Sequence, residues 1–224
     1  MKLYGGKTIN KIKAKVAIPI GLDNVYVAKV TADVAGGKTT YEAPEYAARA
    51  IKCTMTPVTK TGTLESDDAV EIDQTVITGY TVSIEESQLD DYMRALIFGH
   101  RIDRSGGLVI SKTDTPPELA LLCRSKLSDE KNYKYMVLYK GSFKKNAEEY
   151  ETDKRDATTY KTETIEGTFY ARESDGNIKY DLRSDSTAEG AAEKINGWFT
   201  AVPEPDKENL APAAANVSVP TDKK

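Results

Sequence analysis

The sequence contains few of the side chains on which enzymes commonly depend. His100 is the only histidine among 224 residues, which removes most histidine-dependent catalysis and nearly all histidine-rich metal sites. No recognisable nucleophile motif accompanies it, so we expect no catalytic activity, no metal and no cofactor. Because His100 follows Gly99 at the end of a predicted helix, we expect a structural role for its ring, where a positive charge favours the helix dipole.

Cysteines and long apolar runs are also scarce. Cys53 and Cys123 are the only cysteines, too few for a disulfide framework. Each falls on the inward phase of a predicted strand, so we expect buried thiols that pack as small hydrophobic side chains, with a disulfide as the less favoured alternative. No segment approaches the roughly 18 apolar residues of a transmembrane helix, and residues 16–20 are too short for a signal-peptide core. We therefore expect a cytoplasmic product with no membrane partner.

The charge balance argues against a general nucleic-acid binder. Lys and Arg number 31 against 35 Asp and Glu, for a net charge of −4, whereas nucleic-acid-binding domains are normally basic. Gly-Gly-Lys-Thr occurs at residues 5–8 and 36–39. Neither copy has the earlier glycine and the following helix that a phosphate-binding loop needs. We therefore predict no nucleotide site.

The strongest pattern is an alternation of apolar and polar residues over positions 70–86, interrupted only at Ile77. It predicts one strand, bent near Gly79, that is far longer than the usual five or six residues. The dry face would carry Val70, Ile72, Val76, Tyr80, Val82 and Ile84. The wet face would carry Glu71, Asp73, Thr75, Thr81, Ser83 and Glu85. A strand of this length would project beyond a small domain unless neighbouring subunits covered it, which favours assembly over catalysis.

The long strand is predicted to pair with residues 48–56 as a hairpin. The polar residues 57–68 would form its exposed tip, which includes Thr59, Lys60, Thr61, Glu65, Asp67 and Asp68. On alternation alone, the wet face is best explained as an ordinary solvent-exposed surface. The sharper hypothesis is a channel wall, in which several copies close a barrel with a negative lumen that repels DNA phosphates.

The remaining sequence predicts a mainly β fold, a sandwich or barrel. Further strands are expected at residues 21–31, 107–112, 118–127, 133–143, 162–172 and 177–183. One flanking helix is expected at about residues 88–98, capped by Ser87 and ended by Gly99, and a short C-terminal helix after Ser186. We divide the chain into a basic, extended N-terminal arm (residues 1–20), a β domain (21–202) and a Pro/Ala-rich tail (203–224).

Seven segments, taken in order, carry a family resemblance: GLDNVYVAKVT (21–31), YEAP (41–44), AIKCTMTP (50–57), YKYMVLYKG (133–141), EEY (148–150), IEGTF (165–169) and WFTAV (198–202). Together they make the chain similar to the major tail protein, the tail tube subunit, of bacteriophages with long non-contractile tails. The similarity covers about residues 21–205. The N-terminal arm is longer than is usual in that family.

The resemblance implies a β-sandwich flanked by a helix that self-assembles as stacked hexameric rings. The hairpin would then supply an inner barrel with the wet-face residues lining the lumen, and its tip would reach the adjacent ring. The arm and tail would bridge subunits, ordering on assembly. Implied partners are other copies of the chain and the tape measure, tail-tip and tail-terminator proteins. Viral DNA would pass without specific binding, through a virion tail assembled in the host bacterial cytoplasm.

Two other classes of function remain open on the sequence. The first is a β-sandwich binding module that recognises a surface glycan or protein, for which 13 tyrosines could form an exposed aromatic patch. The second is an enzyme, which the missing histidines make the weakest hypothesis. A related structural alternative is the tube of a bacterial contractile secretion system. Clustering of the gene with capsid and tape-measure genes would favour the phage tail.

Overall fold

The computed structural model describes residues 3–4, 7–8, 17–66, 69–87, 89–144 and 162–206. For residues 3–4, 7–8, 48, 63–66 and 69–74 it describes the backbone alone. The expected mainly β fold with two helices is confirmed. The strands are β1 (Leu3–Tyr4), β2 (Lys7–Thr8), β3 (Pro19–Ala32), β4 (Thr40–Tyr41), β5 (Glu45–Ala48), β6 (Ala50–Ser66), β7 (Ala69–Glu86), β8 (Arg101–Ile102), β9 (Leu108–Val109), β10 (Leu119–Leu127), β11 (Tyr133–Lys144), β12 (Glu163–Tyr170) and β13 (Lys179–Arg183). The helices are α1 (Asp91–Phe98) and α2 (Ala191–Asn196).

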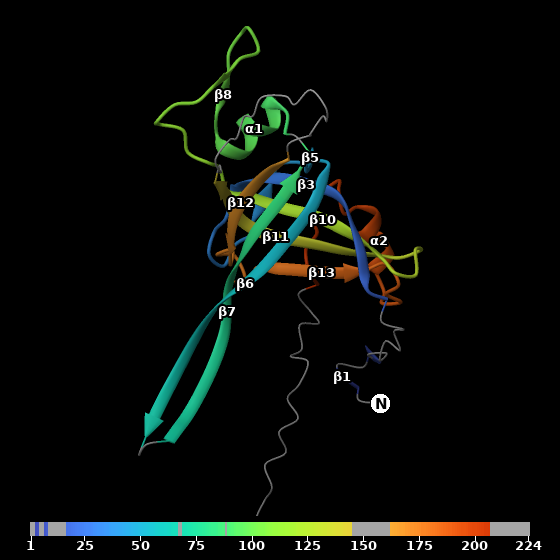
Figure 1. Ribbon diagram of the computed structural model, residues 1–224. Helices are drawn as coiled ribbons and strands as arrows, with labels where there is room; N and C mark the ends of the chain where they lie inside the picture. Colours follow the sequence, from blue (N-terminus) through green and yellow to red (C-terminus); the bar gives the residue numbers. More distant parts are fainter. Residues whose placement is uncertain are drawn as a thin grey trace, which may run out of the picture.

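One antiparallel sheet forms the body of the molecule. Its strands follow the order β4-β3-β10-β11-β12-β7-β6, while β5 also pairs with β3 and β13 with β11. The chain passes from β5 directly into β6, so the two ends of the sheet approach each other and the sheet curls around a core (Figure 1). Two further pairs, β1–β2 and β8–β9, stand apart from this sheet.

Both faces of the central strands are buried. The inner face packs against the inner faces of β3, β7 and β12 and against α1, in a core that includes Leu121, Val82 and Ile97. The outer face of β10 and β11 lies under α2 and the segment that follows it, where Trp198 is fully buried against Tyr135 and Tyr139. The two tyrosines that are buried among the described residues, Tyr135 and Tyr139, therefore both lie in this second core.

Helix α1 closes one end of the curled sheet. Its cap differs from the expectation, because Asp90 rather than Ser87 is the N-cap, with the carboxylate accepting from the amide of Met93 at 2.7 Å. The C-cap is Gly99, as predicted, in the left-handed conformation (φ 72°). Buried Met93 and Ile97 face the inner core, whereas Tyr92 stays 54% exposed.

The β6–β7 hairpin is longer than predicted, and its expected loop is largely strand. Residues 57–66 continue β6 and pair with β7 as far as Ser66 opposite Ala69. Within the described residues β6 pairs only with β7, so Pro57 is tolerated because its missing N–H lies on a strand at the edge of the sheet. In Figure 1 the hairpin extends far from the body, at the end away from α1 and the β8–β9 hairpin.

The two proposed arms fall mostly outside the described residues. β3 already begins at Pro19, and Ile18 exchanges hydrogen bonds with Ser128, so the last residues of the predicted N-terminal arm are fixed to the body. Residues 203–206 are likewise attached, because the Tyr139 hydroxyl donates to the carbonyl of Pro203 at 3.0 Å. The domain boundaries that we inferred from composition stay predictions.

Candidate functional site: the polar wall and the projecting hairpin

A polar surface covers the outer face of β6, β7, β12 and the end of β11, opposite the inner core. We call this surface the polar wall. Register places these residues on it: Lys52, Thr54, Thr56, Ser142, Lys144, Thr164, Glu166 and Thr168, together with the predicted Thr81, Ser83 and Glu85. All eleven are exposed or half-buried. The alternate residues of the same strands, such as Val82, Ile84 and Ile165, fill the inner core.

The wall is organised as cross-strand rows. Thr54, Ser83 and Glu166 form one row, which ends at Lys144. The Lys144 ammonium lies 2.8 Å from the Glu166 carboxylate, and the Thr162 hydroxyl donates to Glu85 at 3.0 Å. Hydroxyls and short side chains dominate among these eleven residues, which gives a hydrated surface.

The charges on the wall are balanced within the body. Glu85 and Glu166 supply two carboxylates, and Lys52 and Lys144 supply two ammonium groups. The expected negative lining would therefore have to come from the hairpin. By sequence, residues 59–78 contain five acidic residues and one lysine. The side chains of Glu71 and Asp73 lie outside the described residues, so their orientation stays a prediction.

A bulge divides the wet face that the sequence predicted as continuous. Val58 is opposite Gly79 while Thr59 is opposite Ile77, so Thr78 is an extra residue in β7. The slip reverses the alternation beyond it, because paired residues point to the same side. Thr75 therefore shares a face with Thr61, to which its hydroxyl is hydrogen-bonded at 3.0 Å. That face continues the core side of the sheet, so the expectation that Thr75 shares a face with Thr81 is wrong.

The root of the hairpin exposes apolar side chains that no described residue covers. Val58 is 41% exposed, Val76 50% and Ile77 46%. Thr59, Lys60 and Thr61 of the predicted tip are exposed strand residues rather than loop residues. Only the backbone of Glu65 is described, and Asp67 and Asp68 lie outside the described part of the chain.

Strand β6 also has one unpaired edge. Within the described residues it pairs with β7 alone along its 17 residues. An edge of this length presents a row of free N–H and C=O groups, which is a template for another strand. The hairpin therefore combines a free edge, exposed apolar side chains and a polar wall at its base.

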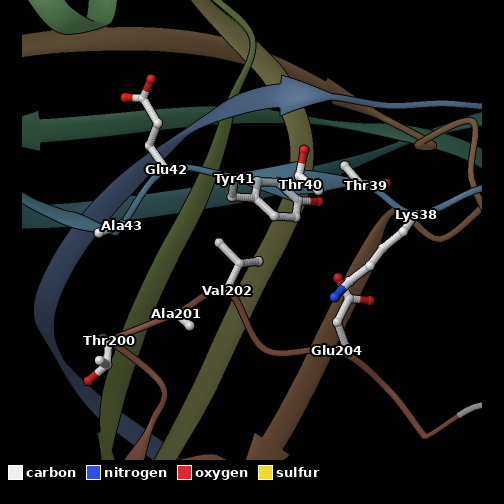
Figure 2. Close-up of a pocket in the computed structure, with 10 residues that line it drawn as sticks. All are labelled: Lys38, Thr39, Thr40, Tyr41, Glu42, Ala43, Thr200, Ala201, Val202 and Glu204. Atoms are coloured by element: carbon white, nitrogen blue, oxygen red, sulfur yellow. The ribbon is translucent and has the colours of Figure 1, made fainter.

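A hollow of about 380 Å³ lies elsewhere, between residues 38–43 and residues 200–204. Figure 2 shows Tyr41 above Val202 and Lys38 extending toward Glu204. Tyr41 and Glu204 both accept hydrogen bonds from Arg172, so the hollow is the seam where the C-terminal segment meets β4. The buried polar atoms without partners in the described structure belong to Glu86, His100 and Trp198, and none of these residues lines it. We assign no ligand to it.

His100 has a structural environment. Its Nδ1 lies 2.9 Å from Oδ2 of Asp114, and both side chains are nearly buried. The backbone amide of Ser111, which donates to Asp114, and the His100 ring together lower the pKa of Asp114. His100 therefore fixes the loop after α1. No group of three or more His, Cys, Asp or Glu side chains within the described ranges is arranged to hold a metal ion, and neither described helix could cross a membrane.

Comparison with known protein families identifies the family of the chain. A family model described as phage tail tube protein matches residues 53–195, well over half of the chain. The chain belongs to this family. The tail tube protein is thus a structural component of a phage tail, of a kind that assembles with itself into a tube. None of the curated proteins compared with the chain matches it.

Sequence analysis alone missed part of the wall of this tail tube protein. Thr164, Glu166 and Thr168 of β12 contribute as much to the wall as β7 does. The alternation over residues 163–170 could have revealed these three residues, because Ile165, Gly167 and Phe169 between them are buried. Lys52 and Lys144 were missed because their placement depends on which strands pair.

Proposed function

We propose that this tail tube protein assembles into stacked, hexameric rings that form the conduit for DNA ejection, with the polar wall facing the lumen. The observation that carries the proposal is that β6, β7 and β12 have a filled core on one face and a hydrated wall on the other, and that β6 and β7 extend as a hairpin that projects far beyond the body. A surface of hydroxyls and balanced charges offers DNA neither a basic patch nor an apolar one, so it favours passage over binding.

Subunits would join by strand addition. The free edge of β6 supplies unpaired backbone groups, and Val58, Val76 and Ile77 supply apolar area beside it. Pairing with a neighbouring copy would give the backbone groups hydrogen-bond partners and would bury the apolar side chains. Repeated around an axis, such a heterologous contact closes a ring. Thr59, Lys60, Thr61, Glu65, Asp67 and Asp68 would then reach the adjacent ring.

The acidic hairpin would make the conduit negative. Glu71, Asp73 and Glu85 are the carboxylates that we propose to repel DNA phosphates, with Thr75, Thr81 and Ser83 as their neutral neighbours in the lumen. Because the Thr78 bulge turns Thr75 to the other face of the hairpin, both faces near the tip would have to meet the lumen or a neighbouring subunit.

The remaining partners follow from the place of a tube in a virion. We propose that the tube surrounds the tape measure protein and ends against tail-tip and tail-terminator proteins, with the N-terminal arm and C-terminal tail bridging subunits. The protein would work in the virion after assembly in the host bacterial cytoplasm, and would catalyse no reaction. A glycan- or protein-binding module is less well supported, because the tyrosine-rich surface is largely buried under the C-terminal segment.

Electron microscopy tests the assembly directly. The purified full-length chain is examined by negative stain, concentrated alone and after incubation with an initiating tail-tip complex. Hollow tubes or rings with six subunits are expected. Persistent monomers under both conditions would reject the proposal, and binding of a glycan array by those monomers would support the binding module in its place.

Charge reversal tests the lumen. In phage tails assembled from Glu71→Lys/Asp73→Lys/Glu85→Lys subunits, DNA ejection should slow by about tenfold, because the wall would attract phosphates. The monomer should still fold, since Glu85 lies outside the core. The matched control is Glu193→Lys on the exposed side of α2, which should eject at the wild-type rate. Unchanged ejection from well-formed triple-variant tails would remove these carboxylates from the lumen.

A further inference from the structure

The short β8–β9 hairpin projects from the end of the molecule opposite the long β6–β7 hairpin (Figure 1). Its two strands pair with each other, Arg101 opposite Val109 and Ile102 opposite Leu108, and stand apart from the main sheet. Residues 101–109 are all described, and none of them belongs to either core. A projection outside both cores is available for contacts with another chain.

Hydrogen bonds nevertheless hold this hairpin in one shape. At its tip, the Asp103 carboxylate accepts from the backbone amides of Ser105 and Gly107, both at 2.8 Å. At its base, Nδ1 of His100 lies 2.9 Å from Oδ2 of Asp114. A surface that is already ordered loses little conformational freedom when a partner binds, so less binding energy is lost to ordering.

The hairpin and the residues that follow it expose cations beside apolar side chains. Arg101, Arg104 and Lys112 are exposed, and none of them has a hydrogen bond or an ion pair within the described part of the chain. Ile102 is 42% exposed and Ile110 57%. We call these five residues the β8–β9 patch. Its chemistry suits an acidic partner that also carries apolar side chains.

The long hairpin has the complementary chemistry. By sequence, residues 59–78 contain five acidic residues and one lysine, with Leu64, Val70 and Ile72 among them. Beyond the bulge, the paired strands advance about 25 Å, which carries the end of the hairpin well clear of its own body (Figure 1). Because the patch and the hairpin lie at opposite ends of the molecule, they can meet only between two chains.

We propose that the β8–β9 patch binds the acidic end of the β6–β7 hairpin of a second copy of this chain. The contact joins two different surfaces, so it is heterologous, and its repetition along an axis builds an open stack. The inference rests on the proposed function and names the surface that receives the hairpin. The free edge of β6 would join subunits within a ring, and the patch would join one ring to the next.

Reversal of the patch charge is the first part of the test. The full-length Arg101→Glu/Arg104→Glu chain should fold, because both side chains are exposed. Under conditions in which the wild type forms tubes, it should give single rings and about tenfold fewer tubes in negative-stain micrographs, because like charges would face each other between rings. The matched control is Lys38→Glu/Lys131→Glu, which reverses two exposed lysines outside the patch and should polymerise as the wild type does.

Reversal of the hairpin charge is the second part. Asp67→Lys/Asp68→Lys should lower the number of tubes to a similar extent, because cations would then face the patch. A chain that carries both reversals should form tubes again, since opposite charges would meet once more. Normal tubes from either reversal alone, or no recovery in the combined chain, would overturn the inference and leave the tube itself standing. Failure of the wild type to form rings or tubes would instead reject the proposed function.

Cross-linking identifies the contact directly. Tubes are grown from an equal mixture of unlabelled and nitrogen-15-labelled chains and treated with a carbodiimide, which joins amines to adjacent carboxylates. We expect a mixed-isotope peptide pair that links Lys112 to Glu65, Asp67 or Asp68. Links from these acids to the lysines of residues 1–20 in their place would assign the end of the hairpin to a neighbour's N-terminal arm and overturn the inference.

Discussion

Arg172 shows how the fold uses a buried charge to hold separate parts of the chain together. Its side chain is 1% exposed and is paired with Asp175 at 2.6 Å and with Glu204 at 2.5 Å, while the Tyr139 ring centroid lies 4.0 Å from its Cζ atom. Every partner of a desolvated guanidinium is needed, because a buried charge left unpaired costs several kcal/mol. The ion pairs of Arg172 thereby fix the C-terminal segment to the turn between β12 and β13.

Glu86 is buried without such compensation. It is 1% exposed, and neither carboxyl oxygen has a hydrogen-bond partner among the described residues. Burial, followed by the nearby charge of Glu163, raises the pKa of Glu86 to about 8, which Arg94 only partly offsets. The folded chain therefore holds a proton that the unfolded chain releases above about pH 4.5.

The Glu86→Gln variant should reveal this linkage. As pH rises from about 4.5 to 8, deprotonation of Glu86 should lower the stability of the wild-type chain by up to about 1.4 kcal/mol per pH unit. Gln cannot lose a proton, so the variant should not show this loss. The free energy of unfolding of the variant should therefore increase relative to that of the wild type as pH rises, by several kcal/mol near pH 8. Urea unfolding across this range measures it. Glu85→Gln, on the polar wall, is the control and should keep the wild-type slope, and parallel profiles for Glu86→Gln and wild type would contradict the assignment.

At the scale of elements, the end of α1 depends on a glycine. Gly99 has φ 72°, and a Cβ placed there would collide with the backbone carbonyl of Thr115. Gly99→Ala should therefore destabilise the chain by about 3 kcal/mol or more, from backbone strain and the clash together. Gly106 is the matched control, because its φ is 85° but a Cβ there meets open space. Gly106→Ala should cost only about 1 kcal/mol. Equal losses in chemical denaturation would show that the contact with Thr115 is unimportant.

Sequence periodicity predicted the elements whose environment is set by their own residues. Val82 and Ile84 alternate with Thr81 and Ser83 because one side of β7 is core and the other is water. The Thr78 bulge was not predictable in this way, since it exists only relative to the register of β6. The strand character of residues 57–66 was missed because their polar composition predicted an exposed loop, whereas an edge strand can accept polar residues and Pro57.

Contacts across the sheet lay beyond any local pattern. Cys53 and Cys123 are 70 positions apart in the sequence, and only the fold brings both side chains to the inner core. The same holds for Lys144 and Glu166, whose ion pair depends on the pairing of β11 with β12. Thr81, Ser83 and Glu85 therefore share a polar face, as the alternation predicted, but the strands that complete this face were not predicted. That these residues line a lumen stays a prediction.

At the scale of the whole molecule, the part of the hairpin beyond Gly79 lies apart from the body. Past Gly79, the described side chains of the hairpin are exposed, including Thr61, Thr75 and Val76. None of them enters either core. The projection therefore adds little to the stability of the free subunit, and a segment of this length that does not stabilise its own chain is available for contacts with others.

Shortening the hairpin should separate folding from assembly. Replacing residues 61–75 by Asn-Gly would leave Lys60 opposite Val76 as the last pair, joined by a two-residue turn that suits such a hairpin. The shortened chain should keep its melting temperature within about 4 °C, because about 1 kcal/mol shifts it by 2–4 °C in a chain of this size. It should form no tubes in electron micrographs. A full-length variant with Asn-Gly in place of Asp67 and Asp68 controls for charge and should still polymerise. Tubes of normal length from the shortened chain would show that the projection is not required for stacking.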